Sequence, residues 1–190
     1  NCNVRIEAVT ANPMVEIKYA GLTIHSHLIG IYNATNISAA IAIGNHFEIE
    51  DALIKEAIEG YIPTNNRSQL LEKNSNKIIL DAYNANPSSM KAAIANFLNL
   101  DTVTPTKIAI LGDMFELGNE SLDEHKTIVA SLKNKEGIEV YFVGKDFFSN
   151  SNDAEHLHFY ENYDSFKESF SKLNPQNSTI LIKGSRGMAL

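Results

Sequence analysis

The chain has 190 residues, of which 44% are hydrophobic and 21% are charged, as in ordinary soluble globular proteins. Its formal net charge of −7 and the absence of a basic stripe in the sequence argue against duplex nucleic acid or an anionic membrane as a partner. The sequence shows no signal peptide and no apolar run of about 18 residues, so we expect no membrane-spanning segment. The single cysteine, Cys2, fits a reducing compartment such as the cytoplasm.

The first segment predicts a β-hairpin beside a further strand. Residues 3–9 and 14–28 alternate apolar and polar side chains, and Ala20-Gly21 stands at a turn position. The chain starts with Asn1 instead of methionine and stops at Leu190 soon after a strand-like run. We therefore interpret the sequence as part of a longer protein.

Two helices are predicted next. Residues 33–47 carry apolar side chains at helical spacing, and a second helix at about 49–59 stops at Gly60, a candidate C-cap. The segment Ile62-Pro63-Thr64 breaks this pattern. We place a domain boundary there, with domains at 1–62 and 63–190.

The second domain alternates short apolar strands with amphipathic helices. Such alternation is typical of an α/β fold with a mainly parallel sheet that is covered on both faces. Asn86 and Pro87 are an expected N-cap and first-turn pair for the first helix. Strands are predicted at 77–80, 107–111, 138–143, 156–160 and 179–183, and helices at 87–99, 121–133 and 163–173.

Each strong strand is followed by a polar or glycine-rich segment. These segments are Asp81–Asn86, Gly112–Gly118, Gly144–Asp146 and Lys183–Gly187. The carboxyl ends of parallel strands lie at one edge of a sheet, where ligands bind. We therefore predict a binding site built from carboxylate, amide and cationic side chains at this edge.

Structural explanations compete with this hypothesis. The acid and asparagines of 81–86 could be local turn and cap residues, and Gly112-Asp113 could be an ordinary turn. Lys183 and Arg186, beside two glycines, suit an anionic ligand but could also be solvated surface. We favour a structural role for Gly144-Lys145.

The histidines give weaker signals. His25 and His27 share one strand face, but no third ligand is near them in sequence, so we favour an exposed face over a metal site. His125 falls about one turn into a helix near the predicted edge, and both a catalytic and a capping role stay open. We predict no metal site. The chain also lacks the glycine-rich phosphate-binding motifs of dinucleotide-binding and P-loop proteins.

Five segments in order resemble the Mur ligase family, in its members that add D-alanyl-D-alanine. They are GIYNATNISAA at 30–40, NRSQ at 66–69, DAYNANPSSM at 81–90, GDMFELG at 112–118 and KGSRGM at 183–188. The resemblance implies a Rossmann-like C-terminal domain, preceded by the strand-and-helix tail of a central ATPase domain. It also implies an ATP-dependent ligase that activates a carboxylate as an acyl phosphate, which an amine then attacks.

The resemblance also implies roles for individual residues. Asn33 and Asn36, one helical turn apart, would bind the adenine edge, Arg67 the phosphates and Asp81 the ribose hydroxyls. The remaining candidates would contact substrates: Tyr83, Asn84, Asn86, Asp113, Lys183, Ser185 and Arg186. Of these, we expect Lys183 and Arg186 to hold the carboxylate of D-alanyl-D-alanine.

The implied cofactors are ATP and Mg²⁺, with the phosphate loop and the metal ligands upstream of this chain. The implied partners are the small molecules UDP-N-acetylmuramoyl-tripeptide and D-alanyl-D-alanine, bound by a cytoplasmic monomer. We expect this chain to be inactive by itself. The alternatives are a non-catalytic nucleotide-binding module, a nicotinamide-dependent oxidoreductase domain, a sister Mur ligase and a folylpolyglutamate synthase relative.

Overall fold

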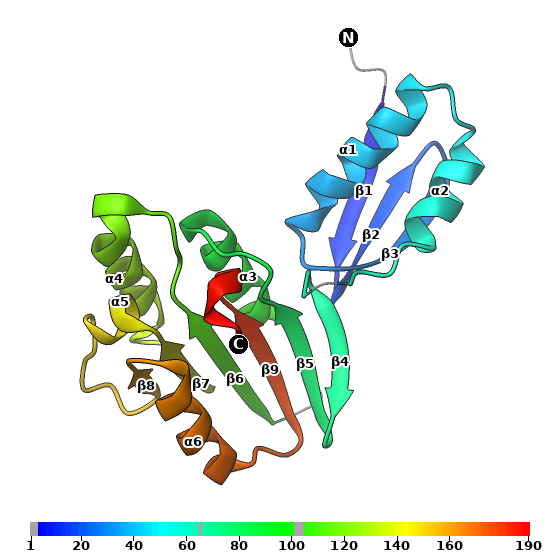
Figure 1. The fold of residues 1–190 in the computed structure, drawn as a ribbon. Coiled ribbons are helices and arrows are strands. Elements are labelled where there is room, and N and C mark those ends of the chain that lie inside the picture. Colours follow the sequence, from blue (N-terminus) through cyan, green and yellow to red (C-terminus); the bar gives the residue numbers. More distant parts are fainter. Residues whose placement is uncertain (1–3, 65, 101–104) are drawn as a thin grey trace. The chain divides into compact units, whose positions relative to one another are not determined.

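The computed structural model describes residues 4–64, 66–100 and 105–190, which form two compact units (Figure 1). The first unit is Asn1–Thr64 with Leu98–Asp101, and the second is Asn65–Phe97 with Thr102–Leu190. No helix among the described residues combines the length and the apolar character needed to cross a membrane.

The first unit contains an antiparallel sheet of order β1-β2-β3. Its strands are β1 (Ile6–Ala11), β2 (Met14–Tyr19) and β3 (Leu22–Ile29). The predicted hairpin is confirmed, because Tyr19 pairs with Leu22 around Ala20 and Gly21. Both turn residues have positive φ, 48° and 72°, as the tight turn favoured by twisted hairpins requires.

Two helices pack on this sheet, as predicted: α1 (Asn33–His46) and α2 (Asp51–Glu59). Ile17, Ile24 and Ile41 are almost fully buried in the shared core. Gly44 lets α1 approach α2, since a Cβ there would lie 2.9 Å from Ile54. Gly60 is the C-cap residue of α2, as expected, but with a right-handed φ of −76°.

The second unit contains a six-stranded sheet of order β4-β5-β9-β6-β7-β8. All neighbouring strands are parallel except the β4–β5 pair, so the predicted mainly parallel sheet is confirmed. The strands are β4 (Gln69–Lys73), β5 (Asn76–Asp81), β6 (Thr106–Gly112), β7 (Ile138–Val143), β8 (Leu157–Tyr160) and β9 (Ser178–Lys183).

Helices cover both faces of this sheet, with α6 in front and α3 behind in Figure 1. Phe166 and Phe170 of α6 pack on Ile108, Ile110 and Ile180. The side chains of Ala109 and Leu181 point to the opposite face and are also buried. The helices are α3 (Pro87–Asn99), α4 (Ser121–Leu132), α5 (Lys145–Phe148) and α6 (Tyr163–Leu173), with short 3-10 turns η1 (Gly118–Glu120) and η2 (Arg186–Met188).

Two elements of the second unit, β4 and α5, were not predicted. β4 is an edge strand with the mostly exposed sequence QLLEK, so burial imposes no clear alternation on it. It turns into β5 through Asn74 and Ser75, both at positive φ. The four-residue α5 is too short to show a helical period.

Candidate functional site

The strand ends of the second unit meet at one edge, as predicted. Asp81 at the end of β5 pairs in register with Lys183 at the end of β9, and Lys183 pairs with Leu111 of β6. Gly112 in turn aligns with Val143 of β7. The segments that follow these strands therefore emerge side by side.

Asp81 and Lys183 form an ion pair at this edge. The Lys183 Nζ donates to Asp81 Oδ2 at 2.7 Å and lies 3.5 Å from the backbone oxygen of Asn84. Only 2% of the Lys183 side chain is exposed, against 15% for Asp81. The second carboxylate oxygen of Asp81 accepts from the backbone N–H of Ser68 at 3.2 Å. The pair thus ties the ends of β5 and β9 to the segment before β4.

This geometry gives Lys183 an internal partner. Its ammonium is buried against Asp81 and does not stand beside Arg186 as a second exposed cation. A carboxylate has about four lone-pair sites, so Asp81 keeps acceptor capacity for a ligand. A joint contact of Lys183 and Arg186 with a substrate carboxylate stays a prediction.

The second feature of this edge is a cluster that we call the arginine–tyrosine stack, formed by Arg67, Tyr83 and Arg186. The Arg67 Cζ lies 3.6 Å from the centroid of the Tyr83 ring, and the Arg186 Cζ lies 5.6 Å from it. Both arginines are exposed. Neither pairs with a carboxylate in the described part of the chain.

Asp113 belongs to a different group, which we call the buried polar network: Asp113, His125 and Ser185. Asp113 is 5% exposed, and its two oxygens accept from the backbone N–H groups of Asp146 and Phe147, each at 3.0 Å. Burial raises the pKa of the Asp113 carboxyl, although these N–H groups and His125 oppose the rise. The carboxylate thus caps α5, and a substrate contact of Asp113 stays a prediction.

Gly144 makes this arrangement sterically feasible. Its φ is +130°, and a Cβ at this position would lie 2.2 Å from the Asp113 carboxyl carbon. No other residue fits here without a shift of the backbone or of the acid. The structural role predicted for Gly144-Lys145 is consistent with this contact.

His125 is fully buried and hydrogen-bonded at both ring nitrogens. Its Nε2 accepts from the backbone N–H of Met114 at 3.0 Å. Its Nδ1 therefore carries the hydrogen and donates to the backbone oxygen of Ser121 at 2.6 Å. Of the two roles left open for His125, this geometry supports the structural one. It holds the loop after β6 on α4.

The ligand atoms of Asp113, His125 and Asp146 lie within 4.8 Å of one another, a spacing that a metal ion could bridge. Each of these three side chains already accepts from a hydrogen-bond donor of the protein, however. Asp113 and His125 accept from backbone N–H groups, and Asp146 accepts from the Ser121 hydroxyl at 2.5 Å. We therefore interpret the three residues as a hydrogen-bond network and assign no metal to them.

Ser185 and Asn86 also serve the fold. Ser185 is buried, and its hydroxyl accepts from the Phe115 N–H at 2.8 Å. Its expected substrate contact stays a prediction. Asn86 is the predicted cap of α3, since its Oδ1 accepts from the Ser89 N–H at 2.8 Å. A substrate contact of Asn86 stays a prediction. Asn84 is exposed, and its Oδ1 accepts from the adjacent Ala85 N–H.

Asn33 and Asn36 lie in the first unit, at the start of α1. The buried Asn33 donates from Nδ2 to the Ile29 oxygen at 2.8 Å and accepts from Asn36 Nδ2 at 3.0 Å. Asn33 therefore orients the exposed Asn36 and does not itself face outward. His25 and His27 are both exposed, as the preferred interpretation requires.

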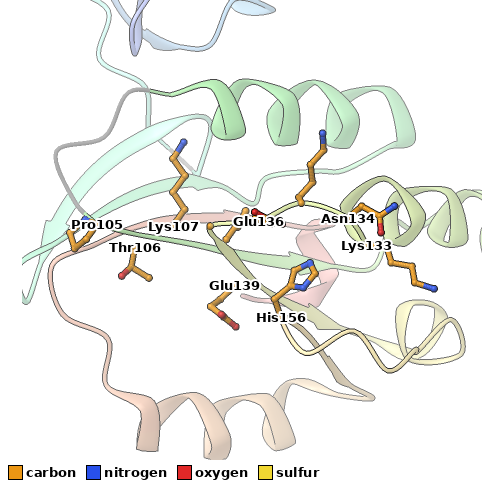
Figure 2. Close-up of a pocket in the computed structure, with 11 residues that line it drawn as sticks. Pro105, Thr106, Lys107, Lys133, Asn134, Glu136, Glu139 and His156 are labelled. Atoms are coloured by element: carbon orange, nitrogen blue, oxygen red, sulfur yellow. The ribbon is translucent and has the colours of Figure 1, made fainter.

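A cavity of about 620 Å³ opens at the opposite edge of the second sheet, where β6 and β7 begin (Figure 2). Side chains of both charges line the cavity, among them Lys107, Lys133, Glu136 and Glu139. None of the site residues predicted from the sequence lines this cavity. We therefore place the candidate site at the carboxyl edge of the sheet and not in this cavity.

Comparisons with known proteins support the same family as the motifs. A family model described as "Mur ligase, glutamate ligase domain" matches residues 66–186. A curated relative from Bacillus subtilis (strain 168), UDP-N-acetylmuramoyl-tripeptide--D-alanyl-D-alanine ligase, is 35% identical over 86% of this chain and 37% of its own length. This chain thus spans little more than a third of that relative.

Solved structures share the fold. A structure of MurF from Acinetobacter baumannii matches with a TM-score of 0.84 at 22% identity, over 98% of this chain and 43% of that one. A MurF ligase from Thermotoga maritima in complex with ADP matches with a TM-score of 0.76 at 17% identity, over 98% of this chain and 44% of that one. Since the family model covers more than half of the sequence, the chain belongs to the Mur ligase family.

Proposed function

We propose that this chain is the C-terminal part of an ATP-dependent ligase that joins D-alanyl-D-alanine to UDP-N-acetylmuramoyl-tripeptide. The observation that carries the proposal is the match to the Bacillus subtilis ligase of that name, at 35% identity over 86% of the chain. The strand-end segments that resemble this ligase type also lie side by side at one sheet edge.

The reaction has two steps. The tripeptide carboxylate attacks the terminal phosphorus of ATP, which gives an acyl phosphate and releases ADP. The amine of D-alanyl-D-alanine then attacks the acyl carbon, and inorganic phosphate leaves as the amine loses its proton. Mg²⁺ would supply charge neutralisation at the phosphates, and its ligands belong to the upstream part of the protein.

We assign residues 1–62 to the tail of the central ATPase domain and 63–190 to the C-terminal domain. Two observations support this division. The family model begins at residue 66, and the two structural units part between Thr64 and Asn65. The whole protein acts as a cytoplasmic monomer in this proposal.

Residues of this chain bind and orient the nucleotide. Asn36, held by Asn33, offers its amide to the adenine edge, and Asp81, held by Lys183, offers acceptor capacity to the ribose. Arg67 contacts phosphate oxygens. Tyr83 and Asn84 lie at the same carboxyl edge of the sheet as Asp81. The ADP complex of the Thermotoga maritima relative supports a nucleotide as the ligand.

The test uses the full-length protein that contains this chain. We expect phosphate release that requires ATP, Mg²⁺, UDP-N-acetylmuramoyl-tripeptide and D-alanyl-D-alanine together, and a product whose mass equals that of the two joined substrates. Single amino acids replace the dipeptide in control reactions. Ligation of a single amino acid in place of the dipeptide would indicate a sister ligase and overturn the proposal.

A further inference from the structure

The two arginines of the arginine–tyrosine stack differ from the buried Lys183 in their ion pairing. Lys183 neutralises Asp81, whereas Arg67 and Arg186 have no carboxylate partner among the described residues. This lack is notable in a chain with a formal charge of −7, where acids outnumber cations. Two unpaired guanidinium groups beside one ring repel each other unless an anion lies between or beside them.

The protein positions both arginines from fixed backbone. The Tyr83 backbone N–H donates to the backbone oxygen of Asn66 at 3.2 Å, which places the tyrosine beside Arg67. The Ser185 backbone N–H donates to the backbone oxygen of Asp113 at 3.1 Å, and the Ser185 hydroxyl accepts from the backbone N–H of Phe115. Arg186 therefore follows directly on a buried residue that is hydrogen-bonded on both sides.

We propose that Tyr83 is a positioning residue that holds Arg67 and Arg186 as one clamp for the polyphosphate of a nucleotide. The assignment rests on the proposed function and deepens it. A cation over an aromatic face is attracted by the ring quadrupole, so the face of Tyr83 offsets part of the repulsion between the two cations. The phenol hydroxyl has no part in this role.

Polyphosphate fits the clamp better than the carboxylate of a dipeptide. One guanidinium already satisfies a carboxylate through two parallel hydrogen bonds. Two guanidinium groups that share one ring present donors to several oxygens at once, and their separation cannot exceed the sum of the two ring distances. A chain of phosphates provides oxygens over such a span. Arg186 therefore acts with Arg67 and not on D-alanyl-D-alanine.

The sequence offers a direct test, because Arg5, Arg67 and Arg186 are its three arginines. NMR spectra of the arginine Nε–H groups, recorded on this chain, would follow each guanidinium during titration with inorganic triphosphate. We expect the Arg67 and Arg186 signals to move together with one dissociation constant, and the Arg5 signal to stay unchanged. D-alanyl-D-alanine, added alone, should move neither signal.

Substitutions at Tyr83 separate the ring face from the hydroxyl. Tyr83→Phe should bind triphosphate like the unmodified chain. Tyr83→Leu should bind it roughly threefold to tenfold more weakly, the range for a partly exposed cation–π contact. Backbone amide spectra of both variants would check the fold.

Three results would overturn the proposal: no movement of either signal with triphosphate, movement of Arg186 with the dipeptide alone, or unchanged triphosphate affinity in Tyr83→Leu. The titration of the unmodified chain decides the first two without any variant. None of these measurements requires turnover. A full-length protein without ligase activity would contradict the proposed function and leave the NMR result intact.

Discussion

Two groups of polar side chains share the carboxyl edge of one sheet but differ in how their atoms are used. In the buried polar network, the side-chain acceptors of Asp113, His125 and Ser185 all receive backbone N–H groups. In the arginine–tyrosine stack, the guanidinium groups of Arg67 and Arg186 lie near the Tyr83 ring and have no carboxylate partner among the described residues. An unpaired buried polar group is costly, so burial selects internal bonds, and the exposed stack keeps its donors for a ligand.

Among changes to the buried polar network, we expect a substitution at Gly144 to destabilise the fold most. A Gly144→Ala change places a methyl group inside the Asp113 carboxyl at a φ of +130°, so backbone strain and overpacking act together. We expect a loss of about 3–5 kcal/mol in the free energy of unfolding. Denaturant unfolding of the chain would measure it.

Gly118→Ala is the matched control for this change. Gly118 also has a positive φ, +58°, but no atom lies within 4 Å of a Cβ there. Its loss should be only about 1–2 kcal/mol, from conformation alone. Equal losses at the two glycines would show that the contact with Asp113 does not matter.

Lys183 allows a sharper comparison. It is a cation, like Arg67 and Arg186, but it is as buried as the residues of the buried polar network. Lys183→Met leaves Asp81 without its ion-pair partner at a mostly buried site, and we expect a loss of about 3 kcal/mol in unfolding free energy. Lys172→Met removes an exposed pair with Glu168 and should change the unfolding free energy much less, because solvent screens such pairs. If both variants lose the same small amount, Lys183 is not held as described.

Asp113 gives a smaller, pH-dependent effect. Burial raises its pKa in the folded state above the ordinary value of 3.8, so the folded chain holds this proton to higher pH than the unfolded chain. Its contribution to stability therefore falls as pH rises from about 3.8 to the raised pKa, and is constant above it. The unfolding free energy of the unmodified chain minus that of Asp113→Asn should decrease across this range. A difference that increases with pH would contradict the raised pKa.

Much of the fold was predictable from the sequence. Runs such as 107–111 and 138–143 are apolar throughout, because both sheet faces are covered, and the Asn86-Pro87 pair marks the start of α3. β4 was missed because an exposed edge strand has no burial pattern. The Mur ligase resemblance, based on ordered motifs, is confirmed.

The roles of individual site residues were less predictable. Lys183, Asp113 and Ser185 are chemically suited to ligands, and the sequence gives no direct sign that they are buried. One signal existed for Lys183, since it lies on the same face of β9 as Thr179 and Leu181, which are both buried. The stack of Arg67 and Arg186 on Tyr83 joins three distant segments. Such a contact depends on loop geometry that no periodicity encodes.

Steady-state kinetics of the full-length protein with Arg186→Gln test the central claim most directly, with each substrate varied in turn. The account predicts a Michaelis constant for ATP that is roughly tenfold higher or more, the effect of losing a charge-assisted hydrogen bond. It predicts that the constant for D-alanyl-D-alanine stays within about twofold, because that substrate does not contact the clamp. A larger effect on the dipeptide than on ATP would contradict the assignment of Arg186 to the polyphosphate.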